Sequence, residues 1–193
     1  DHEAIEKEFK RQPGLSYHLM RMVNSVAGDL PRKINSIKHA ITLMGREQLL
    51  KWIQLLLYTS NSVEDSAVNR RMQTAVERGK LMELIAAAER PHDKNHQERA
   101  FIVGILSLLD ELLGIDMQQI VNKLGISDDM HQALMMREGR LGQALKLVEG
   151  DENGDNTAVE SALAGLGFLN LREFNSIKLH ASDWANQTGE VAN

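Results

Sequence analysis

The sequence predicts an all-α fold, built as a compact bundle of many helices. Its apolar residues recur mostly three or four positions apart, which places them on one face of a helix. Alternating runs of β-branched residues, which would indicate strands, are scarce. Only three prolines occur in 193 residues, so helical runs are rarely interrupted. Because the chain contains no long linker, we expect a single domain over residues 1–193.

The sequence at the start of the chain predicts short helices. Two of them are joined by a polar segment over residues 24–36, called the elbow below. Residues 1–12 have apolar residues at helical spacing and are interpreted as a truncated leading helix. Residues 15–26 predict a second helix, and Ser36 is placed to cap the next one. Asn24 and Ser25 lie inside the apolar stripe of the second helix. We expect their short side chains to bond the exposed backbone groups where the helices meet.

The rest of the chain predicts a series of helices separated by polar breaks. The run over residues 100–113 is apolar nearly all round, so we expect it to be the most buried helix. Asp116, Thr157 and Asn170 each precede a Gln or Glu by three positions, which is the spacing of an N-terminal capping box. The predicted elements are helices over 46–61, 63–89, 100–113, 117–124, 128–136 and 141–149, an acidic loop over 150–156, and a C-terminal helical part over 157–193 with a helix at 171–186.

The composition excludes several classes of function. A net charge of −5 disfavours a nucleic-acid binder that works by overall charge. The absence of cysteine excludes disulfide scaffolds, zinc fingers and thiol nucleophiles. No run approaches the roughly 20 apolar residues that cross a bilayer. The acidic, amphipathic start is unlike a signal peptide and lacks Met, so we expect the chain to be a piece of a longer protein.

The seven histidines offer one candidate metal cluster. His92, Asp93 and His96 lie close together in sequence, but in a segment that we expect to be a polar surface loop. Surface histidines are far commoner than metal ligands, so we predict no metal site there. No serine lies in a GxSxG turn, and no pair of residues resembles a matched general acid and base. The sequence therefore predicts no catalytic residue and no cofactor.

Basic residues gather around the elbow in an otherwise acidic chain. They are the best surface candidate for contact with a partner or an anion, and the alternative is a solvated face. Nine methionines offer a second candidate for an adaptable docking surface, although we expect most of them to fill the core. The basic residues proposed as contacts are Arg21, Arg32, Lys33 and Arg46.

Two stretches carry a family resemblance. They are PGLSYHLMRMVNS (13–25) and INSIKHAITLMGREQLLKWIQLL (34–56), in that order and close together. Through these two stretches the chain resembles the HD-related output domain, or HDOD, family of bacterial signalling proteins. The resemblance implies a compact multi-helix HD-like bundle. Later segments are similar to the subgroup in which this domain follows an EAL domain of the cyclic di-GMP phosphodiesterase superfamily. These segments are AFIVGILSLLDELLG (100–114), residues 131–155 and SDWA (182–185), so that the resemblance spans residues 13–185.

The resemblance implies a degenerate HD site. In active HD phosphohydrolases the buried helix has a His-Asp pair of metal ligands, and Ser107 and Leu108 occupy those two places here. The long helix before it lacks the expected His. The resemblance also identifies Asn24, Ser25 and Ser36 as the signature elbow of the family. It therefore implies a domain without metal or catalysis.

The function that the resemblance implies is a signalling module of a cytoplasmic bacterial protein. We expect it to act through protein–protein contact, with an upstream EAL domain in the same chain, an unidentified protein partner, and a homodimer as a candidate state. We expect no membrane association. The alternatives are a metal-dependent HD-type phosphohydrolase and a nucleic-acid-associated regulator, the latter resting only on the basic residues of the elbow.

Overall fold

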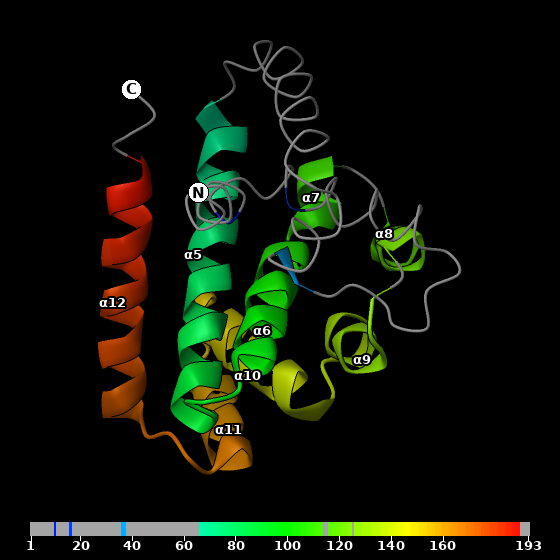
Figure 1. The fold of residues 1–193 in the computed structure, drawn as a ribbon. Helices are drawn as coiled ribbons and strands as arrows, with labels where there is room; N and C mark the ends of the chain where they lie inside the picture. The colour runs from blue at the N-terminus through cyan, green and yellow to red at the C-terminus, as the bar shows by residue number, and fades with distance from the viewer. Residues whose placement is uncertain are drawn as a thin grey trace.

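The computed structural model describes Lys10, Ser16, Ser36, Ile37 and residues 66–113, 116–124 and 126–189. Within these residues every regular element is an α-helix, which confirms the predicted all-α fold (Figure 1). The helices predicted before residue 62 lie outside the described residues, apart from the four single positions just named. None of the described helices is long and apolar enough to cross a membrane.

The described helices follow one another with short connections. Helices α8 and α9 have the predicted bounds, and α5 and α12 match the predicted long helix and C-terminal helix closely. The elements are α5 (Ser66–Glu89), α6 (Lys94–Leu106), α7 (Leu109–Leu113), α8 (Met117–Leu124), α9 (Asp128–Met136), α10 (Gly139–Glu152), α11 (Asn156–Leu166) and α12 (Leu171–Gly189).

The prediction of one helix over residues 100–113 was wrong at its start and missed a break inside it. Helix α6 begins at Lys94, because Asp93 caps it by accepting a hydrogen bond from the His96 amide at 3.0 Å. It ends at Leu106, and Ser107 and Leu108 separate it from α7. The Ser107 hydroxyl donates to the Gly104 carbonyl at 2.7 Å, a local bond that competes with continuation of the helix.

The predicted caps had mixed outcomes. Asn170 and Glu173 form the reciprocal capping box, with both hydrogen bonds at 3.0 Å. Helix α11 is instead capped by Asp155, whose carboxylate accepts from the Ala158 amide at 3.0 Å, so the predicted box at Thr157 was wrong. Helix α10 runs through Glu152, and the acidic segment predicted as a loop over residues 150–156 is non-helical only at 153–155.

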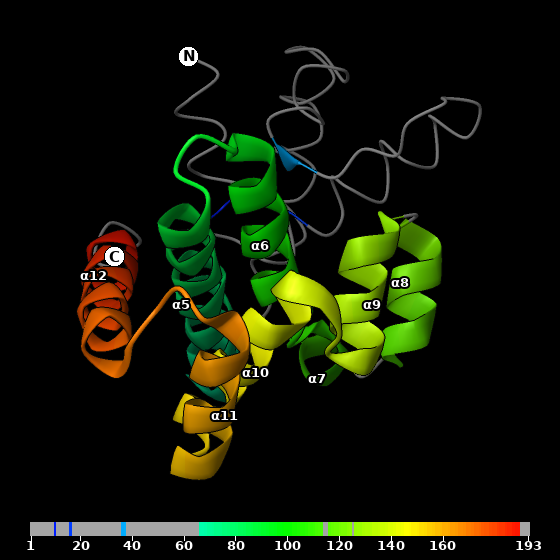
Figure 2. The same ribbon diagram turned by 90° about the horizontal axis from the view of Figure 1, so that it is seen from below.

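Helix α5 is the central element of the described part. Helix α6 packs along one side of α5, and α12 packs along the other (Figures 1 and 2). Helices α10 and α11 lie near one end of α5, and α8 and α9 lie beyond α6. Helices α5 and α6 meet at two glycines, since a Cβ on Gly104 would lie 2.7 Å from the Gly79 Cα. The core around this crossing includes the fully buried side chains of Met82, Ile85, Phe101 and Ile105.

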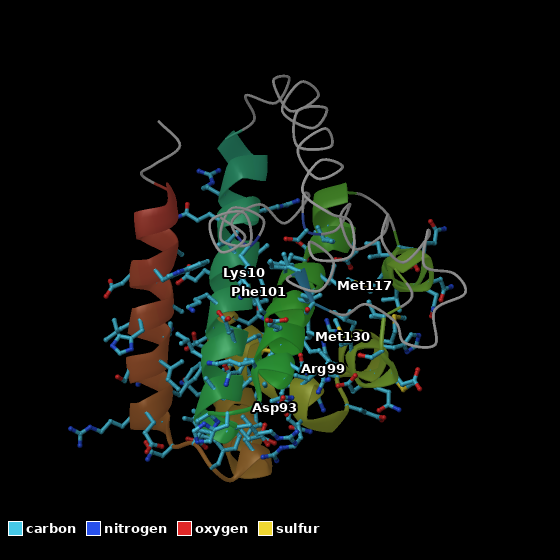
Figure 3. All side chains as sticks on the ribbon, viewed as in Figure 1. Lys10, Asp93, Arg99, Phe101, Met117 and Met130 are labelled. Atoms are coloured by element: carbon cyan, nitrogen blue, oxygen red, sulfur yellow. The ribbon has the colours of Figure 1, made fainter. Side chains whose placement is uncertain are left out.

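Charged side chains lie over this core. The Lys10 ammonium lies 5.0 Å from the centre of the Phe101 ring and 3.0 Å from a Glu83 carboxylate oxygen (Figure 3). Arg99 of α6 is 3.1 Å from a carboxylate oxygen of Asp129 on α9. Lys10 and α9 are thus each joined to the α5–α6 pair by an ion pair.

Candidate functional site

The turn between α6 and α7 contains both residues of the predicted degenerate site. Ser107 is buried and Leu108 is half-buried. The sequence predicted that both lie inside a buried helix, and the structure instead places them where α6 ends. The side chain that faces Ser107 comes from α5, and it is Arg78.

Arg78 is buried, with 7% of its side chain exposed, and it bonds groups from two other elements. Its Nη1 donates to the Ser107 Oγ at 2.8 Å, and its Nε donates to the Glu152 Oε1 at 3.0 Å. Its Nη2 pairs with the second oxygen of Glu152. The guanidinium therefore forks onto one carboxylate and holds the turn after α6 at the same time.

Three acidic residues lie in the last turns of α10, and each has a basic partner outside α10. Glu149 accepts from Arg137 at 2.8 Å and lies 3.9 Å from Arg78, while Asp151 pairs with Lys178 of α12 at 2.6 Å. Carboxylates near a helix C-terminus are opposed by the helix dipole, so these cations offset an unfavourable charge arrangement. Arg137, at the left-handed end of α9 with φ 57°, also donates to the Leu134 carbonyl.

A second charged cluster lies where α5 ends and α6 begins. His96 is buried, not on the surface as predicted, and its Nε2 lies 3.1 Å from a Glu89 oxygen. The other Glu89 oxygen accepts from Arg140 at 2.6 Å. Arg140 also donates to the Leu166 carbonyl at 3.0 Å, at the end of α11. The cluster therefore joins four helices.

The candidate cluster of His92, Asp93 and His96 does not converge on one point. His92 is exposed, Asp93 caps α6, and the His96 ring faces Glu89. Within the described ranges, no group of three or more His, Asp or Glu side chains has the geometry to hold a metal ion.

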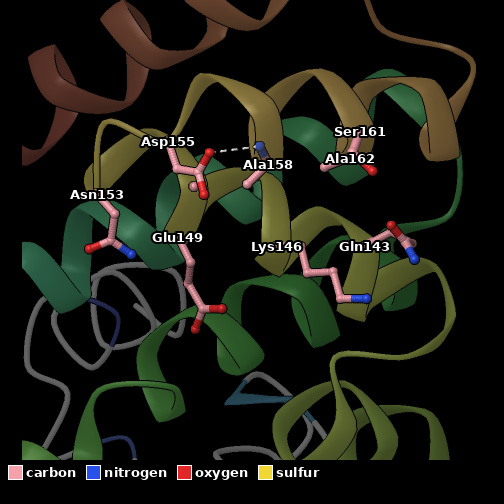
Figure 4. A pocket seen from close by; sticks show the side chains of 9 residues that line it. Gln143, Lys146, Glu149, Asn153, Asp155, Ala158, Ser161 and Ala162 are labelled. Carbon is pink, nitrogen blue, oxygen red and sulfur yellow. Dashed lines mark hydrogen bonds between the residues drawn. The ribbon is translucent and has the colours of Figure 1, made fainter.

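A shallow groove of about 430 Å³ lies between α10 and α11 (Figure 4). Two of its acidic residues are engaged already, since Glu149 pairs with Arg137 and Asp155 caps α11. The other polar side chains that line it include Gln143, Lys146 and Ser161. These groups offer hydrogen bonds, but they include no nucleophile paired with a base.

The other predicted site residues fall mostly in undescribed parts of the chain. The basic candidates Arg21, Arg32, Lys33 and Arg46, and the elbow residues Asn24 and Ser25, lie outside the described residues. Ser36 is described, is buried, and directly precedes the helical residue Ile37.

Sequence reasoning missed Arg78, although its position contains a signal. Arg78 lies three residues after Ala75 and four before Met82, both of which are buried on the inward face of α5. A charged residue on an apolar helix face needs a partner, which predicts a buried ion pair. Its partners Glu149 and Glu152 are more than 70 residues later, so no local spacing points to them.

Comparison with known proteins assigns the family. The HDOD domain family matches residues 1–136, which begins before the resemblance noted from residue 13 and ends with α9. The chain is 32% identical over 193 residues to the cyclic di-GMP phosphodiesterase CdgJ of Vibrio cholerae, covering 99% of this chain and 43% of CdgJ. It is 31% identical over 149 residues to the uncharacterized protein YuxH of Bacillus subtilis, covering 76% of this chain and 36% of YuxH.

The chain thus spans less than half the length of these curated relatives. No solved structure gives a significant match. The family match covers more than two thirds of the chain, including α5 to α9, and every regular element among the described residues is a helix. The chain therefore belongs to the HDOD domain family.

Proposed function

We propose that this chain is a non-catalytic signalling module that acts through protein contact. We further propose that it is the part of a longer cytoplasmic, cyclic di-GMP-related protein that follows an EAL domain. The similarity to CdgJ, which is named as a cyclic di-GMP phosphodiesterase, supports the link to this signalling system. Since the chain matches only 43% of CdgJ, a protein of that length has room for a further domain.

The observation that supports the absence of catalysis is the set of side chains at the degenerate site. An HD-type phosphohydrolase needs a divalent ion held by several imidazole and carboxylate ligands. Here the two places of the His-Asp pair contain the hydroxyl of Ser107 and the alkyl group of Leu108. The group that faces Ser107 is the Arg78 guanidinium, which is a cation. These residues do not fit a divalent metal.

A hydrolysis assay tests the catalytic half of this proposal. Purified chain is incubated with cyclic di-GMP and Mn²⁺, and the products are separated, with an active phosphodiesterase as positive control. We expect no product above background and no stoichiometric metal by elemental analysis. Turnover that is lost in the His96→Ala or Ser107→Ala variant would contradict the proposal and favour a phosphohydrolase.

A pull-down experiment tests the proposal that the chain acts through contact with another protein. Replacing Arg32, Lys33 and Arg46 with Ser should weaken recovery of any protein that the wild type captures, if the basic residues of the elbow dock an acidic partner. A matched control replaces Arg70, Lys146 and Arg172, which are exposed on the described helices and carry the same total charge. Equal recovery by both variants would make the elbow a solvated face, and salt-sensitive binding of DNA or RNA would favour a nucleic-acid regulator.

A further inference from the structure

Arg78 occupies an enclosed position between α5, the turn after α6 and the end of α10. We propose that its guanidinium is an internal cation that fills this position, and that the position is built for a guanidinium and not for a divalent metal ion. This inference goes beyond the proposed function, because it states which side chain of the protein occupies the degenerate site and why a divalent ion does not. Its test measures stability and not turnover, so that either proposal can fail alone.

The hydrogen-bond directions fit a planar fork. Nε and Nη2 of Arg78 meet the two oxygens of Glu152, while Nη1 points to Ser107. The Ser107 proton is directed to the Gly104 carbonyl, so its oxygen is left to accept from Arg78. One side chain thereby satisfies acceptors on two elements, which a point-charge ammonium cannot do in the same geometry.

The charges around this position require a cation. Glu149 and Glu152 are three residues apart on the last turns of α10, where like charges repel and the helix dipole is unfavourable for both. Arg137 compensates Glu149, at 2.8 Å. Without Arg78, the two carboxylates would share one positive charge, although only 25% and 30% of their side chains are exposed.

A divalent ion has a poorer set of ligands at the same position. Divalent ions prefer several oxygen or nitrogen ligands that are free to coordinate. Both oxygens of Glu152 are bonded to Arg78, Glu149 is bonded to Arg137, and Leu108 supplies no ligand atom. The arrangement therefore selects a planar cation with several N–H donors.

Chemical rescue tests the inference. The Arg78→Ala variant should melt about 5–10 °C below the wild type, because it removes the buried guanidinium of a part-buried ion pair and leaves the buried Ser107 oxygen without its donor. Methylguanidinium at millimolar concentration should restore part of that loss relative to its effect on the wild type, and methylammonium at the same concentration should not. The matched control is Arg140→Ala, whose guanidinium also pairs with a glutamate but is 41% exposed. We expect a smaller loss there and no selective rescue.

A second pair of variants keeps the inference testable if Arg78→Ala does not fold. Arg78→Lys retains the charge but not the fork, so it should melt between the wild type and Arg78→Ala. Ser107→Ala should lower the melting temperature in the wild type and have less effect in the Arg78→Lys background, since the bond it removes is already weakened. Equal effects of Ser107→Ala in the two backgrounds would contradict the proposal that the Arg78 guanidinium bonds Ser107 and Glu152 at the same time.

Three other results would also overturn the inference. They are an Arg78→Ala variant that melts like the wild type, equal rescue by methylguanidinium and methylammonium, and an increase in the melting temperature of Arg78→Ala on addition of Mn²⁺. The last result would show that the position accepts divalent ions once the guanidinium is removed.

Discussion

The two sides of α5 are packed by different kinds of contact. On the side of α6, Gly79 and Gly104 bring the two helix backbones together, and Ile105 lies directly beside Gly79. On the side of α12, polar and amphipathic groups contribute, since the Ser182 hydroxyl donates to Glu77 and the Lys80 ammonium lies 5.2 Å from the Trp184 ring centre. Close approach of two backbones characterises the first interface, whereas the second adds polar and cation–π contacts beside a helix whose Phe174 and Ala181 are buried in the core.

This difference indicates which interface fixes the fold. Two backbones in contact have no flexible atoms that can move aside, so their crossing has little tolerance for a larger residue. Half-buried side chains such as Trp184 can be repositioned at lower cost. The α5–α6 crossing also lies inside the family match, whereas α12 lies outside it. The four substitutions below test this contrast, from the largest expected effect to the smallest.

Gly104→Val should be the most destabilising of them. A Cβ at Gly104 meets the Gly79 Cα at 2.7 Å and the Arg78 carbonyl at 2.8 Å, both of them backbone atoms. We expect a loss of about 3 kcal/mol in the free energy of unfolding, measured by urea denaturation. Ala88→Val, at an exposed position of α5, controls for the lower helix propensity of Val. A loss below about 1 kcal/mol at Gly104 would show that the crossing is adaptable.

Glu83→Gln should have a pH-dependent effect. Burial raises the pKa of the Glu83 carboxyl, but the nearby Lys10 and Lys80 lower it more, so that it lies below its ordinary value of 4.5. A carboxyl whose pKa is lower in the folded state contributes stability above the unfolded pKa, and this contribution is lost as the pH falls through the folded pKa. We expect a loss of about 2 kcal/mol at pH 7 for the variant, from the charged hydrogen bonds removed.

The measurement is a series of urea denaturation curves from pH 7 to pH 3. The difference between wild type and Glu83→Gln should be constant near neutral pH and shrink below about pH 4.5. Glu160→Gln, at an exposed position on α11, is the control and should show a small difference at every pH. A Glu83 difference that grows as the pH falls would contradict the pairing with the two lysines.

Trp184→Ala should have an intermediate effect on the α12 side. The indole is half-buried and lies beside the Lys80 ammonium, so the substitution removes apolar packing and a cation–π contact. We expect a loss of about 1.5 kcal/mol by thermal or urea denaturation, less than for Gly104→Val, and a smaller loss for Trp184→Phe. A larger loss than that of Gly104→Val would reverse the contrast between the two interfaces.

Leu179→Ser should have the smallest effect. Leu179 is 67% exposed on α12, and substitutions at exposed positions usually change stability by less than about 0.5 kcal/mol. Circular dichroism melting curves of the variant and wild type should therefore coincide within about 2 °C. A larger decrease would show that this part of α12 is covered in solution.

Sequence patterns predicted the short amphipathic helices better than the buried one. Helices α8 and α9 have polar breaks on both sides, so the apolar pattern ends where each helix ends. Helix α6 is buried on nearly all sides, and its apolar pattern continues through Leu106 into α7 without a visible break. The bond from Ser107 to Gly104 that marks the end of α6 depends on a side-chain orientation that periodicity does not contain.

The candidate site was predicted only in part, for a similar reason. The resemblance pointed to Ser107 and Leu108, but the residues that define their surroundings come from distant parts of the chain. Arg78 is 29 positions before Ser107, and Glu152 is 74 positions after Arg78. His96 was interpreted as a surface residue because its neighbours in sequence are polar, although the half-buried Glu89 at the end of α5 lies within hydrogen-bond distance of its ring. Pairings at such separations are set by tertiary packing.

The position of α10 has a consequence for how the chain unfolds. The family match ends at residue 136, yet Leu145, Leu147 and Val148 of α10 are fully buried in the same core as Phe101 of α6. A fragment that stops at residue 136 would expose that core surface and deprive Arg78 of its acidic partners. We therefore expect the backbone amides of α6 and α10 to exchange with solvent through one shared opening, so that the cooperative folding unit extends beyond the segment by which the family is recognised.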